Sequence, residues 1–478
     1  MQENQKVMNN FAWRFLERCG AQGVSFVVSI VLARLLAPEA YGTIALVTVF
    51  TSLLQVFIGS GLGTALIQKK DADDLDFSTV FFFNSGLCIV LYAILFFTAP
   101  YISGFYQMPE LTPVTRVLGL TLLISTIKGI QHSYVAKKMI FKRFFFATLG
   151  GTLGAAVVGI YMAYKGYGVW ALVAQSLFNN LIDTLVLWFT VKWRPKWMYS
   201  WRRLKGLFAY GWKILVSALL DTGYRELRQL IIGKVYTAGD LAYYNKGNQF
   251  PNLIIDNINS SINSVLLPAM AAEQDNVARV RGMTRRAIKI STFIIMPMMM
   301  GLAVCAEPLI RLLLTEKWLP CVLFLRIYCF SYAFYPIHTA NLSAIKALGR
   351  SDLFLGMEIL KKAIGLIAVV ATMFISVEAM AYSMLATTVL SQIINAWPNK
   401  KLLGYSYFEQ VKDMLPQILL SCAMGAVVYC VSFFPLPDIV LLVIQVVTGV
   451  VVYTTGSALL RLESFNYILA TIKNKTKK

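Results

Sequence analysis

The chain has 478 residues, of which 57% are hydrophobic and only 14% are charged. A soluble domain carries about 25% charged residues, enough to cover its surface with polar groups. This chain cannot cover a water-facing surface of its size, so most of its surface must face lipid. The composition excludes a disordered chain, a secreted disulfide scaffold and a soluble nucleotide-binding enzyme. It predicts an all-α integral membrane protein.

The charge balance is strongly basic, with 44 Lys and Arg against 24 Asp and Glu, a net charge of +20. In a soluble protein this excess would indicate nucleic-acid binding. In a membrane protein, basic residues collect in the cytoplasmic loops and set the topology. We favour the second interpretation, and no nucleic-acid partner is expected.

Apolar segments of about 20 residues predict fourteen membrane-spanning helices. With the N-terminus placed in the cytoplasm, 32 of the 44 Lys and Arg lie in cytoplasmic segments and only 6 lie on the opposite face. This asymmetry predicts that both termini are cytoplasmic. Pro251, Pro297 and Pro336 lie within spans and predict kinks. In chain order, the predicted spans are 11–36, 42–66, 77–99, 114–135, 144–164, 169–191, 207–232, 241–267, 286–306, 318–344, 353–374, 377–397, 414–434 and 437–460.

Weak internal similarity at an offset of about 200 residues predicts a repeat. The segment GVWALVAQSL at 168–177 resembles SVEAMAYSML at 376–385. Six spans separate the two copies, and an even number keeps their orientation, so the repeat is parallel. We therefore predict two pseudo-symmetric six-helix lobes, residues 1–200 (spans 1–6) and 201–410 (spans 7–12). Residues 411–478 hold two further helices and a basic tail.

The eighth span carries the clearest polar pattern. Its amides and one carboxylate recur every three or four residues, which places them on one helix face. Such a face is costly against lipid and must meet water or a polar partner. We expect it to line a central polar cavity; the alternative is interhelical hydrogen bonding that only holds a bundle together. The line consists of Asn245, Asn248, Asn252, Asp256, Asn259 and Asn263.

Charged residues on spans 1, 7 and 8 are the candidates for the chemistry of this cavity. An excess of cations suits an anionic cargo, and arginine is well shaped for phosphate. An intramembrane carboxylate can carry the H⁺ or Na⁺ that drives a transport cycle. For each residue, ion pairing within its own helix is the alternative. The cations are Arg14, Arg18, Lys213, Arg225, Arg228 and Lys246, and the carboxylates are Asp221, Glu226 and Asp256.

The motif Asp71-Ala-Asp73-Asp74 matches the DxD pattern that binds metal and nucleotide-sugar in glycosyltransferases. It lies in a short loop with no globular domain to hold a nucleotide, so a solvated loop is favoured. Motifs for ATP hydrolysis or for metal binding do not occur in a plausible context. No cofactor is expected.

Four short motifs carry a resemblance to a known family: VLARLLAPEAYG at 31–42, GLGTALIQ at 61–68, GDLAYY at 239–244 and ALGR at 347–350. With these, the chain resembles the Wzx-type, or WzxC-like, flippases of lipopolysaccharide biosynthesis. They form the polysaccharide transporter branch of the multidrug/oligosaccharidyl-lipid/polysaccharide (MOP) superfamily. The resemblance covers nearly the whole chain.

The resemblance implies a flippase that moves undecaprenyl-diphosphate-linked oligosaccharides across the bacterial inner membrane, by alternating access driven by an ion gradient. It implies that arginines of spans 1 and 7, here Arg14, Arg18, Arg225 and Arg228, hold the diphosphate. The asparagine face would solvate sugar. We expect a monomer that works with membrane lipids and with a polysaccharide polymerase and assembly enzymes.

Two other functions are weighed against this one. A multidrug or cation antiporter of the same superfamily would have a cavity dominated by carboxylates and aromatic residues, which the excess of cations opposes. A membrane enzyme acting on lipid-linked sugars would need a sizeable extramembrane loop, which the short predicted connections oppose. The sequence therefore predicts a transporter and not an enzyme.

Overall fold

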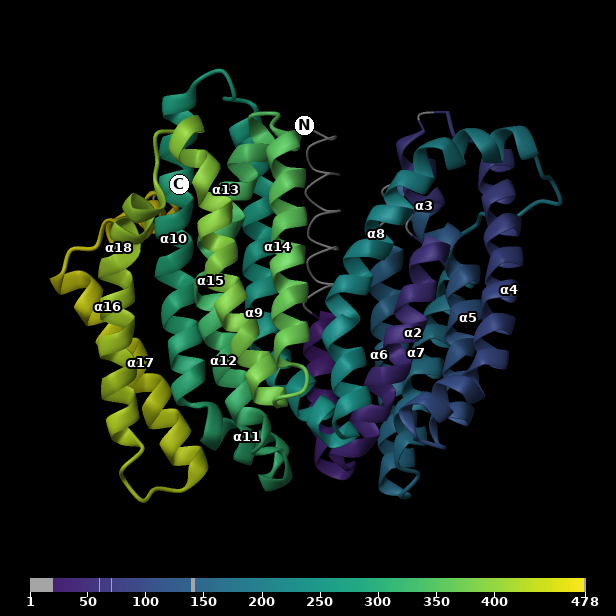
Figure 1. Cartoon of the computed structure of the whole chain (residues 1–478), viewed down its shortest axis with the longest axis horizontal. Coiled ribbons are helices and arrows are strands. Elements are labelled where there is room, and N and C mark those ends of the chain that lie inside the picture. Colours follow the sequence, from purple (N-terminus) through teal and green to yellow (C-terminus); the bar gives the residue numbers. More distant parts are fainter. Residues whose placement is uncertain (1–19, 60, 70, 139–141, 477–478) are drawn as a thin grey trace. The chain divides into compact units, whose positions relative to one another are not determined.

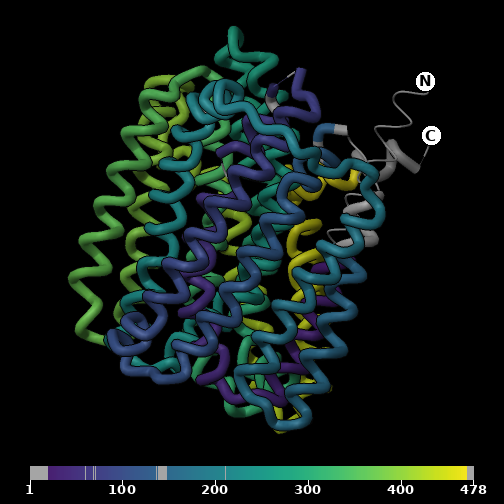
Figure 2. The backbone as a smooth tube through the Cα atoms, turned by 90° about the vertical axis from the view of Figure 1, so that its right-hand side faces the viewer, coloured from purple at the N-terminus to yellow at the C-terminus, as the bar shows by residue number. Residues whose placement is uncertain are grey.

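The computed structural model describes residues 20–476 apart from positions 60, 70 and 139–141. Within this part of the chain, every regular element is a helix (Figure 1). The chain divides into two compact units, Met1–Ala242 and Tyr243–Lys478. Figure 2 shows the backbone as long helices joined by short connections.

The described part of the first unit is a bundle of long helices joined by short turns. It begins with a helix over residues 20–35. The helices that follow are α2 (Pro38–Gly59), α3 (Leu62–Gln68), α4 (Asp74–Tyr106), α5 (Leu111–Lys138), α6 (Lys142–Tyr164), α7 (Val169–Thr190) and α8 (Trp201–Val235).

The second unit begins within α9 (Ala238–Ala271), whose first turn belongs to the first unit. Its other helices are α10 (Val277–Val304), α11 (Ala306–Leu314), the 3₁₀ turn η1 (Glu316–Trp318), α12 (Cys321–Ala333), α13 (Tyr335–Ala347), α14 (Ser351–Thr372), α15 (Val377–Leu402), α16 (Tyr407–Val431), α17 (Asp438–Leu459) and α18 (Glu463–Thr476).

Each predicted span overlaps a helix or a pair of consecutive helices. In the described residues, nine helical segments are long and apolar enough to cross a membrane, which confirms a multi-pass membrane protein. The total of fourteen spans and the lobe boundaries stay predictions. The division into packing units falls after α8, whereas the predicted lobe boundary falls before it.

Of the three prolines expected to kink spans, only Pro336 lies at a break in the helix. There α12 ends at Ala333, and α13 starts at Tyr335 with Pro336 in its first turn. Proline fits the first turn because its missing N–H has no helical acceptor there. Pro251 and Pro297 lie inside helices that continue through them.

Close helix contacts in the first unit depend on glycine. A Cβ atom built on Gly42 of α2 would lie 1.8 Å from the carbonyl oxygen of Ala238, at the start of α9. Similarly, a Cβ on Gly61 would lie 2.7 Å from the carbonyl oxygen of Gly211 in α8. Because backbone atoms form these contacts, no rotamer change can relieve a larger side chain.

Gly42→Ala is therefore expected to lower the free energy of unfolding by about 1–3 kcal/mol, the usual cost of overpacking. Thermal unfolding of the purified protein in detergent measures this loss of stability. Gly86→Ala in α4 is the matched control, because a Cβ there meets no atom within 4 Å. Equal melting temperatures for the two variants would contradict the close approach.

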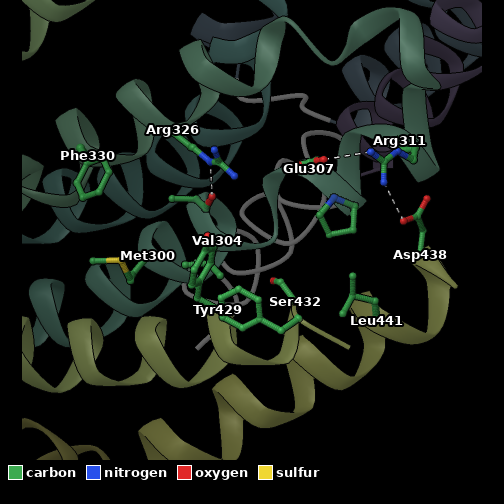
Figure 3. A pocket seen from close by; sticks show the side chains of 13 residues that line it. Met300, Val304, Glu307, Arg311, Arg326, Phe330, Tyr429, Ser432, Asp438 and Leu441 are labelled. Atoms are coloured by element: carbon green, nitrogen blue, oxygen red, sulfur yellow. Dashed lines mark hydrogen bonds and ion pairs between the residues drawn. The ribbon is translucent and has the colours of Figure 1, made fainter. Parts of the chain in front are cut away.

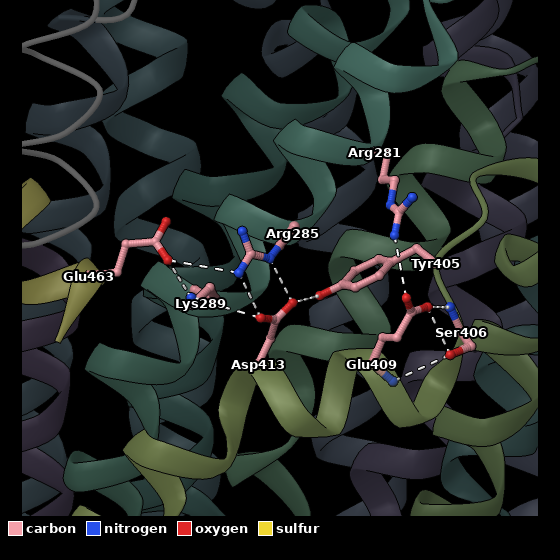
Figure 4. A network of polar contacts seen from close by, with 8 residues as sticks. All are labelled: Arg281, Arg285, Lys289, Tyr405, Ser406, Glu409, Asp413 and Glu463. Carbon is pink, nitrogen blue, oxygen red and sulfur yellow. Dashed lines mark hydrogen bonds and ion pairs between the residues drawn. The ribbon is translucent and has the colours of Figure 1, made fainter.

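A polar network fixes the C-terminal helices of the second unit to α10 (Figure 4). Arg285 donates two hydrogen bonds to Asp413 of α16, at 2.8 and 2.9 Å, and the Tyr405 hydroxyl donates to the same carboxylate at 2.8 Å. Lys289 of α10 bonds to Glu463 at the start of α18. This bond lowers the pKa of the Glu463 carboxyl below its usual value. The network explains why α18, which is too polar for a span, packs on the bundle.

Candidate functional site

Helix α8 carries three of the predicted cavity cations. Lys213 and Arg225 are exposed, whereas Arg228 is half-buried. Arg225 Nε lies 3.9 Å from the Asp221 carboxylate one turn earlier, which is a long contact for an ion pair. The Nε atom of Arg228 is buried without a hydrogen-bond partner in the described part of the chain. A guanidinium with an unsatisfied N–H group suits an external anion.

Three other predicted residues of spans 1 and 7 remain: Glu226, Arg14 and Arg18. Glu226 is half-buried and accepts a hydrogen bond from Gln229 on the same helix. Gln229 is a neutral amide, so this contact is not an ion pair, and ion coupling by Glu226 stays a prediction. Arg14 and Arg18 lie outside the described residues, so their predicted role stays a prediction.

The asparagine face of α9 meets hydroxyl groups of α12 and α13 in the second unit. The Tyr332 hydroxyl donates to Asn248 Oδ1 at 2.9 Å and lies 3.5 Å from Asn252 Oδ1. Thr339 donates to Asn259. These are interhelical hydrogen bonds of the kind expected from the alternative interpretation. They hold the amides in fixed orientations, and contact with sugar stays a prediction.

The other predicted residues of α9 differ in their exposure and contacts. Asp256 is exposed and accepts a hydrogen bond from Asn252 Nδ2 at 2.8 Å. Asn245 is half-buried. Lys246 is only 6% exposed, and its ammonium lies 5.6 Å from the centre of the Trp318 ring, a cation–π contact. Direct substrate binding by Lys246 therefore requires this contact to open.

The first unit contains an intramembrane ion pair that was not predicted from the sequence. Lys128 of α5 lies 2.6 Å from the Asp183 carboxylate of α7 and 3.0 Å from the Asn180 side-chain oxygen. The two charged side chains are 18% and 12% exposed. Ionisable residues inside membrane bundles face the bundle interior or a water-filled cavity and often mark substrate or ion pathways. The available signal was one basic residue in the middle of the predicted span 114–135 and one acidic residue in the predicted span 169–191.

The DxD motif is a helix start held by ion pairs. Asp73 caps α4, where its side chain accepts from the Asp76 N–H and lies 2.7 Å from Arg203. Burial raises the pKa of the Asp73 carboxyl, but these hydrogen bonds outweigh it and leave the pKa below its usual value. Asp74 pairs with Lys196 at 2.6 Å. Both carboxylates are thus paired with cations of α8 and of the α7–α8 connection. No cluster of His, Cys, Asp and Glu suited to a metal occurs in the described residues.

The helical fold of this multi-pass membrane protein is similar to that of a solved flippase. A solved structure of the lipid II flippase MurJ, in an inward closed conformation, matches with a TM-score of 0.77 at 14% identity, covering 95% of this chain and 98% of that one. The model of a family described as "polysaccharide biosynthesis protein" matches residues 31–323. The chain belongs to this family, which confirms the resemblance noted in the sequence.

Two curated relatives extend the comparison. The succinoglycan biosynthesis transport protein ExoT of Rhizobium meliloti is 24% identical over 313 residues, 65% of this chain and 63% of ExoT. The chain thus spans somewhat less than two thirds of ExoT in this match. The teichuronic acid biosynthesis protein TuaB of Bacillus subtilis is 25% identical over 417 residues, 84% of this chain and 85% of TuaB.

Proposed function

We propose that this chain is a flippase that moves undecaprenyl-diphosphate-linked oligosaccharide repeat units across the bacterial inner membrane, and that it is a transporter and not an enzyme. The observation that carries the proposal is the group of three cations on α8, Lys213, Arg225 and Arg228, in a member of the polysaccharide biosynthesis family. A diphosphate is the part of such a cargo that arginine and lysine bind best. The names of the relatives link the matched sequence to two different polysaccharides and, for ExoT, to transport.

In the proposed mechanism, the protein opens its polar cavity alternately to each side of the membrane. Both termini lie in the cytoplasm, in agreement with the distribution of basic residues between the loops. The diphosphate binds the α8 cations and Arg14 and Arg18, while the lipid tail stays in the bilayer. The asparagine amides of α9 offer donors and acceptors to sugar hydroxyls.

We further propose that an H⁺ or Na⁺ gradient drives the cycle, since no motif for ATP hydrolysis occurs in the sequence. Asp221, Asp256 and Glu226 are the candidate ion-binding carboxylates. The protein works as a monomer and delivers its product to a polysaccharide polymerase and assembly enzymes.

The test is the profile of lipid-linked oligosaccharides in cells with and without the protein. Accumulation of complete, unpolymerised repeat units on the lipid carrier is the expected result, because assembly is finished before flipping. Truncated units would indicate an assembly enzyme. An unchanged profile with altered efflux of cationic drugs would indicate the antiporter. Either of these two outcomes would contradict the proposal.

A further inference from the structure

A cavity of about 490 Å³ lies within the second unit, where α10, α11 and α12 face the α16–α17 hairpin (Figure 3). Ser432 directly follows α16, and Asp438 begins α17, so the cavity lies where the hairpin turns. In the orientation proposed above, this end of the bundle faces the outer leaflet. Four charged side chains line the cavity: Glu307, Arg311, Arg326 and Asp438.

One arginine uses both carboxylates of the cavity. Arg311 lies 3.0 Å from Glu307 on its own helix and 3.4 Å from Asp438 of α17. These pairs join α11 to α17 at the rim. The Nε atom of Arg311 is nevertheless buried without a hydrogen-bond partner in the described residues.

The second arginine, Arg326 of α12, has no carboxylate within ion-pair distance in the part of the chain that the structure describes. Its Nε donates to the carbonyl oxygen of Ala303 at 3.2 Å, which fixes the guanidinium beside the cavity (Figure 3). A cation in a membrane helix is costly unless an anion or water compensates it. The terminal N–H groups of Arg326 therefore leave a place for an anionic ligand.

The remaining wall indicates what kind of anion fits. The Ser432 hydroxyl accepts a hydrogen bond from Gln445 at 2.8 Å, which leaves its own proton to donate. The other side of the cavity is apolar and includes Met300, Val304 and Leu441. A planar arginine fork and a hydroxyl donor suit phosphate oxygens, and the apolar wall suits an attached hydrocarbon chain.

We propose that this cavity binds the phosphate of a phospholipid headgroup from the outer leaflet, with Arg326 as its main ligand. The bound lipid would join the α16–α17 hairpin to α10 and α12. The proposal takes only its membrane orientation from the proposed function. Because the test measures lipid binding and not transport, failure of one proposal is distinguishable from failure of the other.

The experiment titrates phosphatidylglycerol onto the purified, delipidated full-length protein and counts bound lipids by native mass spectrometry. Arg326→Gln is expected to weaken the tightest binding event by about tenfold, the usual effect of losing a charge-assisted hydrogen bond. Arg116→Gln is the matched control, because Arg116 also donates its Nε to a backbone carbonyl, that of Phe96 at 3.1 Å, and does not line this cavity.

A second variant keeps the test decisive if Arg326→Gln does not fold. Asp438→Asn frees Arg311 from one carboxylate and is expected to strengthen phosphatidylglycerol binding. A merely structural role of the pocket would not produce these opposite changes. Unchanged binding in Arg326→Gln, or no gain in Asp438→Asn, would overturn the proposal. Equal displacement of the lipid by inorganic phosphate at the same concentration would assign the site to free phosphate and also overturn it.

Discussion

Replacing Arg228 with alanine is expected to lower export of the lipid-linked repeat unit by about 10- to 100-fold, the largest effect on activity that this account predicts. A hydrogen bond to a charged group contributes about 1.5–3 kcal/mol, and each 1.4 kcal/mol corresponds to a factor of ten. The Nε of Arg228 has no hydrogen-bond partner among the described residues, so the substitution breaks no hydrogen bond of this atom within the protein. Accumulated lipid-linked units in complemented deletion cells measure the loss.

The control lies on the same helix. Arg202 is exposed in the first turn of α8, and Arg202→Ala is expected to export at the wild-type rate. Arg228→Lys should retain part of the activity, since it keeps the charge but loses the planar fork. Wild-type export by Arg228→Ala, at equal protein level, would refute a role of Arg228 in holding the diphosphate.

Lys128→Ala is expected to have the largest effect on stability, about 3–5 kcal/mol in the free energy of unfolding. It leaves the Asp183 carboxylate, 12% exposed, without its cation inside the first unit. The double variant Lys128→Met with Asp183→Leu should recover most of the loss, because no charge then remains buried. Thermal unfolding in detergent gives both values.

An exposed lysine provides the control for this pair. Lys165 lies in the turn after α6, with its ammonium 5.9 Å from the Tyr161 ring, and Lys165→Ala should change the melting temperature little. If Lys128→Ala and Lys165→Ala have the same melting temperature, the buried ion pair does not stabilise the fold. A recovered melting temperature without recovered export in the double variant would assign the pair a role in transport.

Hydropathy predicted the positions of the helices well, because lipid imposes long apolar segments on the sequence. The predicted spans 169–191 and 437–460 agree with the bounds of α7 and α17 to within one residue at each end. For the same reason, hydropathy did not predict the helices that are too short or too polar to cross the membrane. The short α11 and the polar α18 carry no span-length apolar signal, and the contacts of α18 with Lys289 appear only in three dimensions.

The polar residues were harder to interpret than the helices. Periodicity placed Asn248, Asn252 and Asn259 on one face of α9 but did not show what that face meets. The structure supplies Tyr332 and Thr339 as partners. Likewise, a charge in a span, such as Lys128, is visible in the sequence, whereas its partner on another helix depends on which helices pack together and on their rotation.

The most direct test of the central claim is flipping by the purified protein. Liposomes containing the protein and the host's own undecaprenyl-diphosphate oligosaccharide are treated from outside with a glycosidase, and the uncleaved cargo is followed over time under an imposed ion gradient. The account predicts that all of the cargo becomes accessible with the wild-type protein, whereas Arg228→Ala and protein-free liposomes retain the inner-leaflet fraction. Retention of that fraction by the wild-type protein under both H⁺ and Na⁺ gradients would contradict the account.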